Sequence, residues 1–135
     1  MTKPPAVPTP PVPPPNYRRG DIWMVDFGNP VGTELGMEHP AMIVSIQELN
    51  NAPIRRAIIV PGTSTRITNA QGQTIRVHHE VPASPSNGLD HTTYFMSEQV
   101  RTVPLIRFRR LVGAIEQRHV REIEDRLCLV MGLFR

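Results

Sequence analysis

The stretch of residues 19–45 constrains the fold most, because its sequence favours two short strands joined by an irregular loop. Residues 41–44 form a continuous apolar run, and its length and β-branched content favour a buried strand over a helix. The first strand is expected over residues 22–27, with Asp21 and Asp26 marking its polar side or its ends. The side chains expected on one side of that strand are Ile22, Met24 or Val25, and Phe27.

The segment between these two strands, residues 28–40, contains too much glycine and proline for regular structure. It carries Glu34, Glu38 and His39, and His39 lies directly before Pro40 at the edge of the second strand. Reactive groups are often found on loops that rigid strands anchor. We therefore place the first candidate functional site in this loop.

The rest of the chain predicts a mainly β domain with one C-terminal helix. Strands are expected at residues 41–46, 56–60, 74–81, 91–96, 100–103 and 113–115, with a polar turn at 47–53 and a strand break at Pro61-Gly62. Residues 104–111 are either a short strand or a turn. From Glu116 the apolar residues recur at helical spacing, and this helix is expected to end at Gly132. Such a pattern indicates a strongly bent sheet or a small barrel.

The N-terminal residues 1–16 differ in composition from the rest, since they hold eight of the 15 prolines. Such a segment is polyproline-like or disordered, and it lacks the continuous apolar region of a signal peptide. A solvated tail is the favoured interpretation, and a ligand for a proline-binding module is the alternative. We expect one folded domain over residues 17–135, without an apolar run of the roughly 20 residues that span a bilayer.

Cysteine and arginine usage narrows the possible functions. Cys128 is the only cysteine, which excludes an internal disulfide and favours a reducing cytoplasm. No cluster of cysteine and histidine suits a zinc site, because the neighbours His78 and His79 would point to opposite faces of a strand. Apart from Lys3, every one of the 15 basic residues is arginine, whose planar fork suits phosphates and bases. Nucleic acid is therefore a reasonable partner.

Several motifs in fixed order resemble the MazF/PemK family of toxin–antitoxin ribonucleases. They read RGDIWMVDF at residues 19–27, GTE at 32–34, HPAMIV at 39–44, VPGTS at 60–64, MSEQVRTV at 96–103 and RRLVG at 109–113. The resemblance covers residues 18–134. It implies an SH3-like small β-barrel of the MazF/CcdB type with a C-terminal helix.

The resemblance also implies an activity and partners. The chain would be a cytoplasmic, homodimeric, sequence-selective endoribonuclease that cleaves single-stranded RNA without a metal or another cofactor. Attack by the 2′-hydroxyl would leave a 2′,3′-cyclic phosphate and a 5′-hydroxyl. The expected partner is a MazE-like antitoxin with a disordered, acidic tail.

The motifs assign roles residue by residue. The catalytic candidates are His39, Thr63 and Glu34, and the RNA-binding candidates are Ser64, Arg66, Gln99, Arg101 and Phe27. His39 occupies the position where the family usually has arginine. An imidazole exchanges protons near neutral pH but is a weaker phosphate clamp than a guanidinium. Arg66 is a candidate for the missing cation, and Thr63 for a hydroxyl that donates to a phosphate oxygen.

Three alternatives stay open from the sequence. The chain could be catalytically inactive at His39, or it could be a gyrase-targeting binding protein on the same barrel, as in the CcdB branch. For the dense basic run of Arg107, Arg109 and Arg110, contact with a phosphate backbone is supported about equally with a solvated edge or pairing with Glu116 and nearby acids.

Overall fold

The computed structural model describes residues 4, 16–32 and 36–133. Its strands are β1 (Asp21–Asp26), β2 (Glu38–Ile43), β3 (Arg56–Thr63), β4 (His78–Val81), β5 (Thr93–Met96), β6 (Arg101–Pro104) and β7 (Phe108–Ala114). Its helices are α1 (Gln47–Asn50) and α2 (Gln117–Met131), with 3-10 turns η1 (Ser97–Gln99) and η2 (Leu105–Arg107). The predicted tail at residues 1–16 lies almost entirely outside the described residues.

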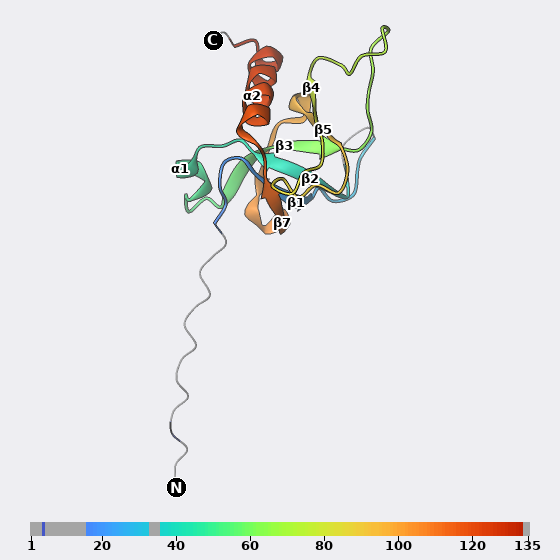
Figure 1. Cartoon of the computed structure of the whole chain (residues 1–135). Helices are drawn as coiled ribbons and strands as arrows, with labels where there is room; N and C mark the ends of the chain where they lie inside the picture. The colour runs from blue at the N-terminus through green and yellow to red at the C-terminus, as the bar shows by residue number, and fades with distance from the viewer. Residues whose placement is uncertain (1–3, 5–15, 33–35, 134–135) are drawn as a thin grey trace.

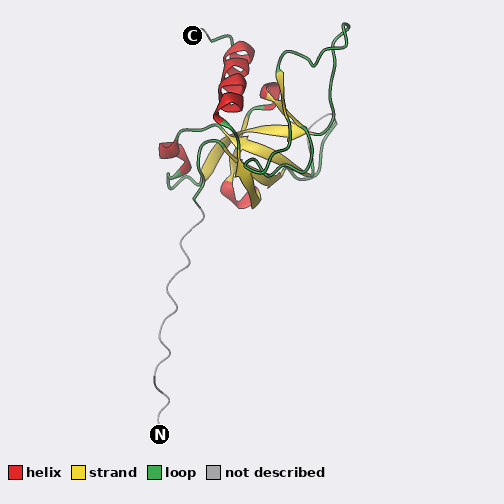
Figure 2. Cartoon of the chain, in the orientation of Figure 1, coloured by secondary structure: helices red, strands yellow, loops and turns green. Residues whose placement is uncertain are grey.

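The strands form one antiparallel sheet in the order β4-β5-β3-β2-β1-β7, and β6 pairs with β3. Strand β3 has three partners along its length: residues 56–59 pair with β6, residues 59–61 with β2, and Gly62 and Thr63 with β5. Figure 1 shows α2 standing over one side of the strands, and Figure 2 shows how few helical residues the chain has besides it. The predicted fold, mainly β with a C-terminal helix, is confirmed.

Two apolar clusters lie on opposite faces of the strands. The first, between the sheet and α2, contains Ile22, Met42, Val60, Val81, Leu89, Phe95, Ile115, Val120, Ile123 and Leu127. The second contains Trp23, Val25, Ala41, Ile43, Ala57, Ile59, Val103, Leu105 and Phe108, with Tyr17 and Phe27 packed against it. The prediction that Ile22 and Phe27 share one side of the first strand was therefore wrong. Strict alternation places Phe27 with Trp23 and Val25.

Several element boundaries differ from the sequence predictions. Pro61 and Gly62 do not end β3, since both are buried and paired within it. Pro61 lies opposite Ala41 in the pairing of β2 with β3, although proline has no N–H to donate to a neighbouring strand. Strand β4 begins at His78 rather than at residue 74, and residues 47–50 form a helical turn. Residues 108–114 form one continuous strand, which resolves the ambiguous segment.

Helix α2 ends where the sequence predicts. Gly132 adopts a left-handed conformation with φ of 67°, which costs a glycine no steric strain. The N–H of Leu133 donates to the Cys128 carbonyl at 2.8 Å, and that of Gly132 donates to the Leu129 carbonyl at 3.2 Å. These are the two bonds of a Schellman cap. Among the described residues, no helix is long and apolar enough to cross a membrane.

Candidate active site

His39 lies at the start of β2, where the ends of three strands meet. It pairs with Val25 on β1, and two residues further along β2 the pairing with β3 begins, at Ala41 and Pro61. Its Nδ1 lies 3.2 Å from the carbonyl oxygen of Gly62. Because a carbonyl only accepts hydrogen bonds, Nδ1 must carry the hydrogen. The neutral imidazole therefore keeps its lone pair on Nε2.

Three of the predicted RNA-binding residues gather beside His39. The ring centroid of Phe27 lies 6.2 Å from that of His39 in an edge-on arrangement. The guanidinium carbon of Arg101 lies 5.3 Å from the Phe27 centroid, which is the geometry of a cation–π contact. Arg101 also donates to the Gln99 side-chain oxygen at 2.8 Å and to the Gln99 carbonyl at 3.2 Å. Phe27 thus connects a half-buried imidazole with a fixed cation.

Thr63 and Ser64 follow directly at the end of β3. The Thr63 hydroxyl oxygen accepts a hydrogen bond from the backbone N–H of Thr65 at 3.2 Å. This local turn leaves the hydroxyl hydrogen of Thr63 available for donation. Thr63 is half-buried and Ser64 is exposed. Both candidates therefore lie at the same end of the sheet as His39.

Arg66, the candidate for the missing cation, is hydrogen-bonded within the loop that follows β3. Its Nε donates to the Thr74 hydroxyl at 2.9 Å, and its Nη2 donates to the Gly72 carbonyl at 3.2 Å. These bonds brace the long loop between β3 and β4, which projects from the sheet in Figure 1. In the described part of the chain, Arg101 contacts an aromatic neighbour of His39 and Arg66 does not.

The loop that carries the remaining candidate is closed at its base. Phe27 N–H donates to the Met37 carbonyl at 2.8 Å, and Met37 N–H donates to the Gly28 carbonyl at 2.7 Å. Glu34, predicted as a catalytic residue, lies outside the described residues. The structure therefore leaves its role a prediction.

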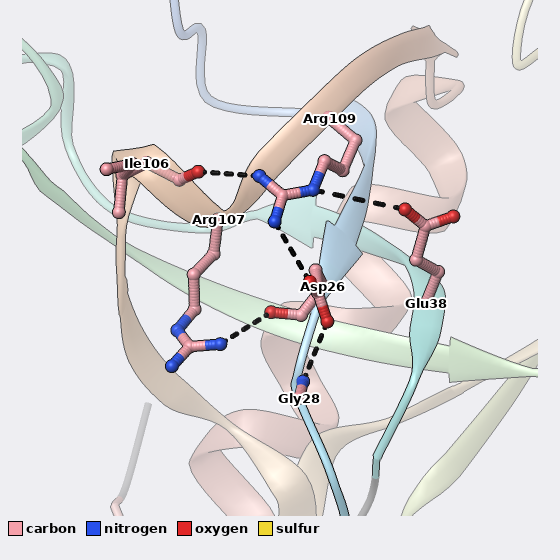
Figure 3. Close-up of polar contacts among 6 residues, drawn as sticks. All are labelled: Asp26, Gly28, Glu38, Ile106, Arg107 and Arg109. Atoms are coloured by element: carbon pink, nitrogen blue, oxygen red, sulfur yellow. Dashed lines mark hydrogen bonds and ion pairs between the residues drawn. The ribbon is translucent and has the colours of Figure 1, made fainter.

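Sequence reasoning missed the polar contacts next to this base, which Figure 3 shows. The Asp26 carboxylate accepts from Gly28 N–H at 2.8 Å and pairs with Arg109 at 2.9 Å. The Gly28 N–H, and after it Arg109, hold the pKa of the Asp26 carboxyl below its ordinary value. The spacing of Asp26 and Gly28 is typical of an Asx turn and was the one available signal. Arg109 is 83 residues away in sequence and gave none.

Pairing with an acid was one prediction for the basic run of Arg107, Arg109 and Arg110. Arg109 does pair with an acid, but the acid is Asp26 and not Glu116. Glu116 instead accepts from Asn87 at 3.0 Å and from Ser84 at 3.2 Å. Arg107 donates to the Asp26 carbonyl at 3.3 Å. Two of the three arginines are thus occupied in holding the end of β1.

Comparison with known proteins places this arrangement in a family. The family described as "PemK-like, MazF-like toxin of type II toxin-antitoxin system" matches residues 18–131. The chain belongs to this family. The matched region contains every described residue of the candidate site.

Two curated relatives carry the same family name. The chain is 27% identical to endoribonuclease MazF9 of Mycobacterium tuberculosis over 121 residues, which is 87% of this chain and 98% of the relative. It is also 27% identical to endoribonuclease MazF of Staphylococcus saprophyticus over 116 residues, which is 86% of this chain and 92% of the relative.

Solved MazF structures have the same fold. The Deinococcus radiodurans MazF (Form-I) superposes with a TM-score of 0.67 at 19% identity, covering 84% of this chain and 94% of that one. A mycobacterial endoribonuclease in complex with its cognate antitoxin gives a TM-score of 0.64 at 23% identity, with 87% and 96% covered. These similarities confirm the barrel-like fold predicted from the MazF/PemK motifs.

The histidines outside the site occupy separate contacts, as their alternation on β4 predicts. His78 Nε2 lies 2.9 Å from Glu98, whereas His79 Nε2 lies 2.8 Å from His119 Nδ1 on α2. Burial, followed by the nearby Arg126 and His119, lowers the pKa of His79 to about 4. Among the described residues, no group of three or more potential ligands suits a metal ion.

Proposed function

We propose that this MazF-family protein is a toxin of a type II toxin–antitoxin system and a sequence-selective, metal-independent endoribonuclease that cleaves single-stranded RNA. The observation that carries the proposal is the seating of His39 on the Gly62 carbonyl. It leaves an imidazole nitrogen with a free lone pair beside Phe27, which Arg101 contacts, and Thr63 directly follows Gly62 in the chain. The names of the curated relatives support the same activity.

The proposed chemistry uses the nucleophile that RNA itself supplies. His39 Nε2 takes the proton of the 2′-hydroxyl while that oxygen forms a bond to phosphorus. The bond from phosphorus to the 5′-oxygen breaks, and the leaving oxygen takes a proton from water. The Thr63 hydroxyl donates to a non-bridging oxygen as charge develops there. The products are a 2′,3′-cyclic phosphate and a 5′-hydroxyl.

The RNA-binding residues have complementary roles in this proposal. Phe27 offers a ring for stacking on a base, and Arg101, held by Gln99, offers a cation to the neighbouring phosphate. Ser64 is exposed beside Thr63 and is available to a further phosphate oxygen. Arg66 contributes by bracing its loop rather than by binding the reacting phosphate.

The proposed partners are a second copy of the chain and a cognate antitoxin. A mycobacterial structural neighbour is described in complex with its cognate antitoxin, and two Deinococcus radiodurans structures are described as MazE-MazF. An acidic, disordered antitoxin segment would pair with Arg101 and occupy the RNA site.

The test is incubation of the purified protein with a long single-stranded RNA in excess EDTA, with the new ends mapped. We expect discrete cuts with 5′-hydroxyl ends, and a loss of at least about 100-fold in rate for His39→Ala. His91→Ala is the matched control, because His91 is exposed and its side chain makes no hydrogen bond or ion pair in the described structure. Intact RNA at high protein excess would overturn the proposal and favour the gyrase-targeting alternative.

A further inference from the structure

Two residues of the proposed site each adjoin an acid in the sequence. Phe27 follows Asp26, and His39 follows Glu38. Asp26 and Glu38 are paired across β1 and β2, at the last position of this pairing. Because neighbouring side chains on a strand point to opposite faces, the two acids lie on the face opposite to Phe27 and His39. A group that holds both acids would therefore fix the two strand ends without covering the site.

Arg109 is positioned to do this (Figure 3). Its Nη2 lies 2.9 Å from the Asp26 carboxylate, and its Nε lies 4.0 Å from the Glu38 carboxylate. Its Nη1 donates to the Ile106 carbonyl at 2.8 Å, which ties the guanidinium to the turn before its own strand. Two nitrogens of one planar fork thus reach the two strand ends, and the third holds the fork to the turn before β7.

The contacts continue from Asp26 into the loop base. The second carboxylate oxygen of Asp26 accepts from Gly28 N–H at 2.8 Å, and Arg107 donates to the Asp26 carbonyl at 3.3 Å. The chain returns at Met37, a non-glycine residue with a positive φ of 63°. Such a backbone conformation persists only where its surroundings hold it. Arg109 with Asp26 and Glu38, here called the Arg109 clamp, is joined to this loop base through the hydrogen bond from Gly28 N–H to Asp26.

We propose that Arg109 is a positioning residue that sets Phe27 and His39 relative to each other by holding Asp26 and Glu38 from the opposite face. The proposal rests on the proposed ribonuclease function for its catalytic consequence. Arg109 makes no contact with RNA in this account. Removal of its fork leaves the site residues present but displaced, and displacement lowers the rate of the chemical step more than substrate binding.

The test compares Arg109→Gln with Arg121→Gln, a matched removal of an exposed arginine on α2 that makes no hydrogen bond or ion pair in the described structure. On a mapped RNA substrate, we expect Arg109→Gln to lower kcat about tenfold, with KM changed less than about twofold. Arg121→Gln keeps both constants. Adding Asp26→Asn to Arg109→Gln should lower kcat little further, because both changes break the same contact.

A second readout needs no RNA. Hydrogen exchange at the Phe27 and Met37 amides should be about tenfold faster in Arg109→Gln than in the wild type and unchanged in Arg121→Gln. Unchanged exchange would overturn the clamp. A raised KM with normal kcat would also overturn it, since that result means direct phosphate contact. If the wild type fails to cut RNA, the ribonuclease proposal fails, and the exchange rates still decide whether the clamp exists.

Discussion

At the scale of single residues, the site depends on backbone groups as much as on side chains. The Gly62 carbonyl fixes which nitrogen of His39 carries the hydrogen. Gly62 is also the residue of β3 at which the pairing with β5 begins. A Cβ built on Gly62 would lie 2.5 Å from Cγ2 of Thr93. Glycine is therefore required here for close packing rather than for an unusual φ.

This packing predicts the effect of Gly62→Ala. The added methyl group should lower the free energy of unfolding by about 1–3 kcal/mol, because the neighbouring strand must shift. Thr93→Ser removes the Cγ2 that causes the clash, so the double variant should recover part of the loss. Urea unfolding of the three variants measures both effects. A double variant less stable than Gly62→Ala would contradict this explanation.

The sequence predicted part of the site, and the reason is visible residue by residue. Phe27, Gln99 and Arg101 were found because each belongs to a family motif, and the structure brings them together beside His39. The contacts of Arg66 with Gly72 and of Arg109 with Asp26 were not predicted, since no local pattern shows which group a guanidinium binds. Contacts between residues 83 apart in sequence follow from topology.

At the scale of elements, the strands and the final helix were predicted correctly where the spacing of apolar residues and the positions of glycine and proline indicate the same boundaries. The predictions failed where a buried environment overrides a local breaker, as at Pro61-Gly62. They also failed before β4, where Thr74 forms only an isolated bridge with Thr68. Helix α2 packs on β4 partly through the pair of His79 and His119. This contact makes the packing of the helix sensitive to pH.

The sign of the pH effect follows from the pKa of His79. Its folded-state pKa is lowered from the ordinary 6.5 to about 4, mainly by burial and to a smaller extent by the positive charge of Arg126. The carboxylates of Glu122 and Glu80 raise the pKa, but less than burial lowers it. Between pH 6.5 and 4, His79 is therefore protonated in the unfolded chain but not in the folded chain. The stabilising contribution is complete above pH 6.5 and is lost as the pH falls toward 4.

Urea unfolding between pH 7.5 and pH 5 measures this contribution. The free energy of unfolding should fall by up to about 1.4 kcal/mol per pH unit from this group. His79→Gln should flatten the dependence, and the control His91→Gln should leave it unchanged, because His91 is exposed. Equal slopes in the wild type and His79→Gln would show that His79 does not cause it.

At the scale of the whole molecule, the fold brings distant segments to one end of the sheet. Phe27 follows β1, His39 is the second residue of β2, Thr63 ends β3 and Arg101 begins β6. None of these residues forms a site alone, and a bent antiparallel sheet is what places them together. We propose that this group of residues at one end of the sheet activates the 2′-hydroxyl of RNA.

The most direct measurement uses an oligonucleotide that contains one mapped cut site. Its partner substrate is identical except for a single 2′-deoxynucleotide on the 5′ side of the scissile phosphate. In excess EDTA, we expect rapid cleavage of the all-RNA oligonucleotide and no cleavage of the 2′-deoxy substrate. Cleavage of both substrates at similar rates would contradict attack by the 2′-hydroxyl and with it the role assigned to His39.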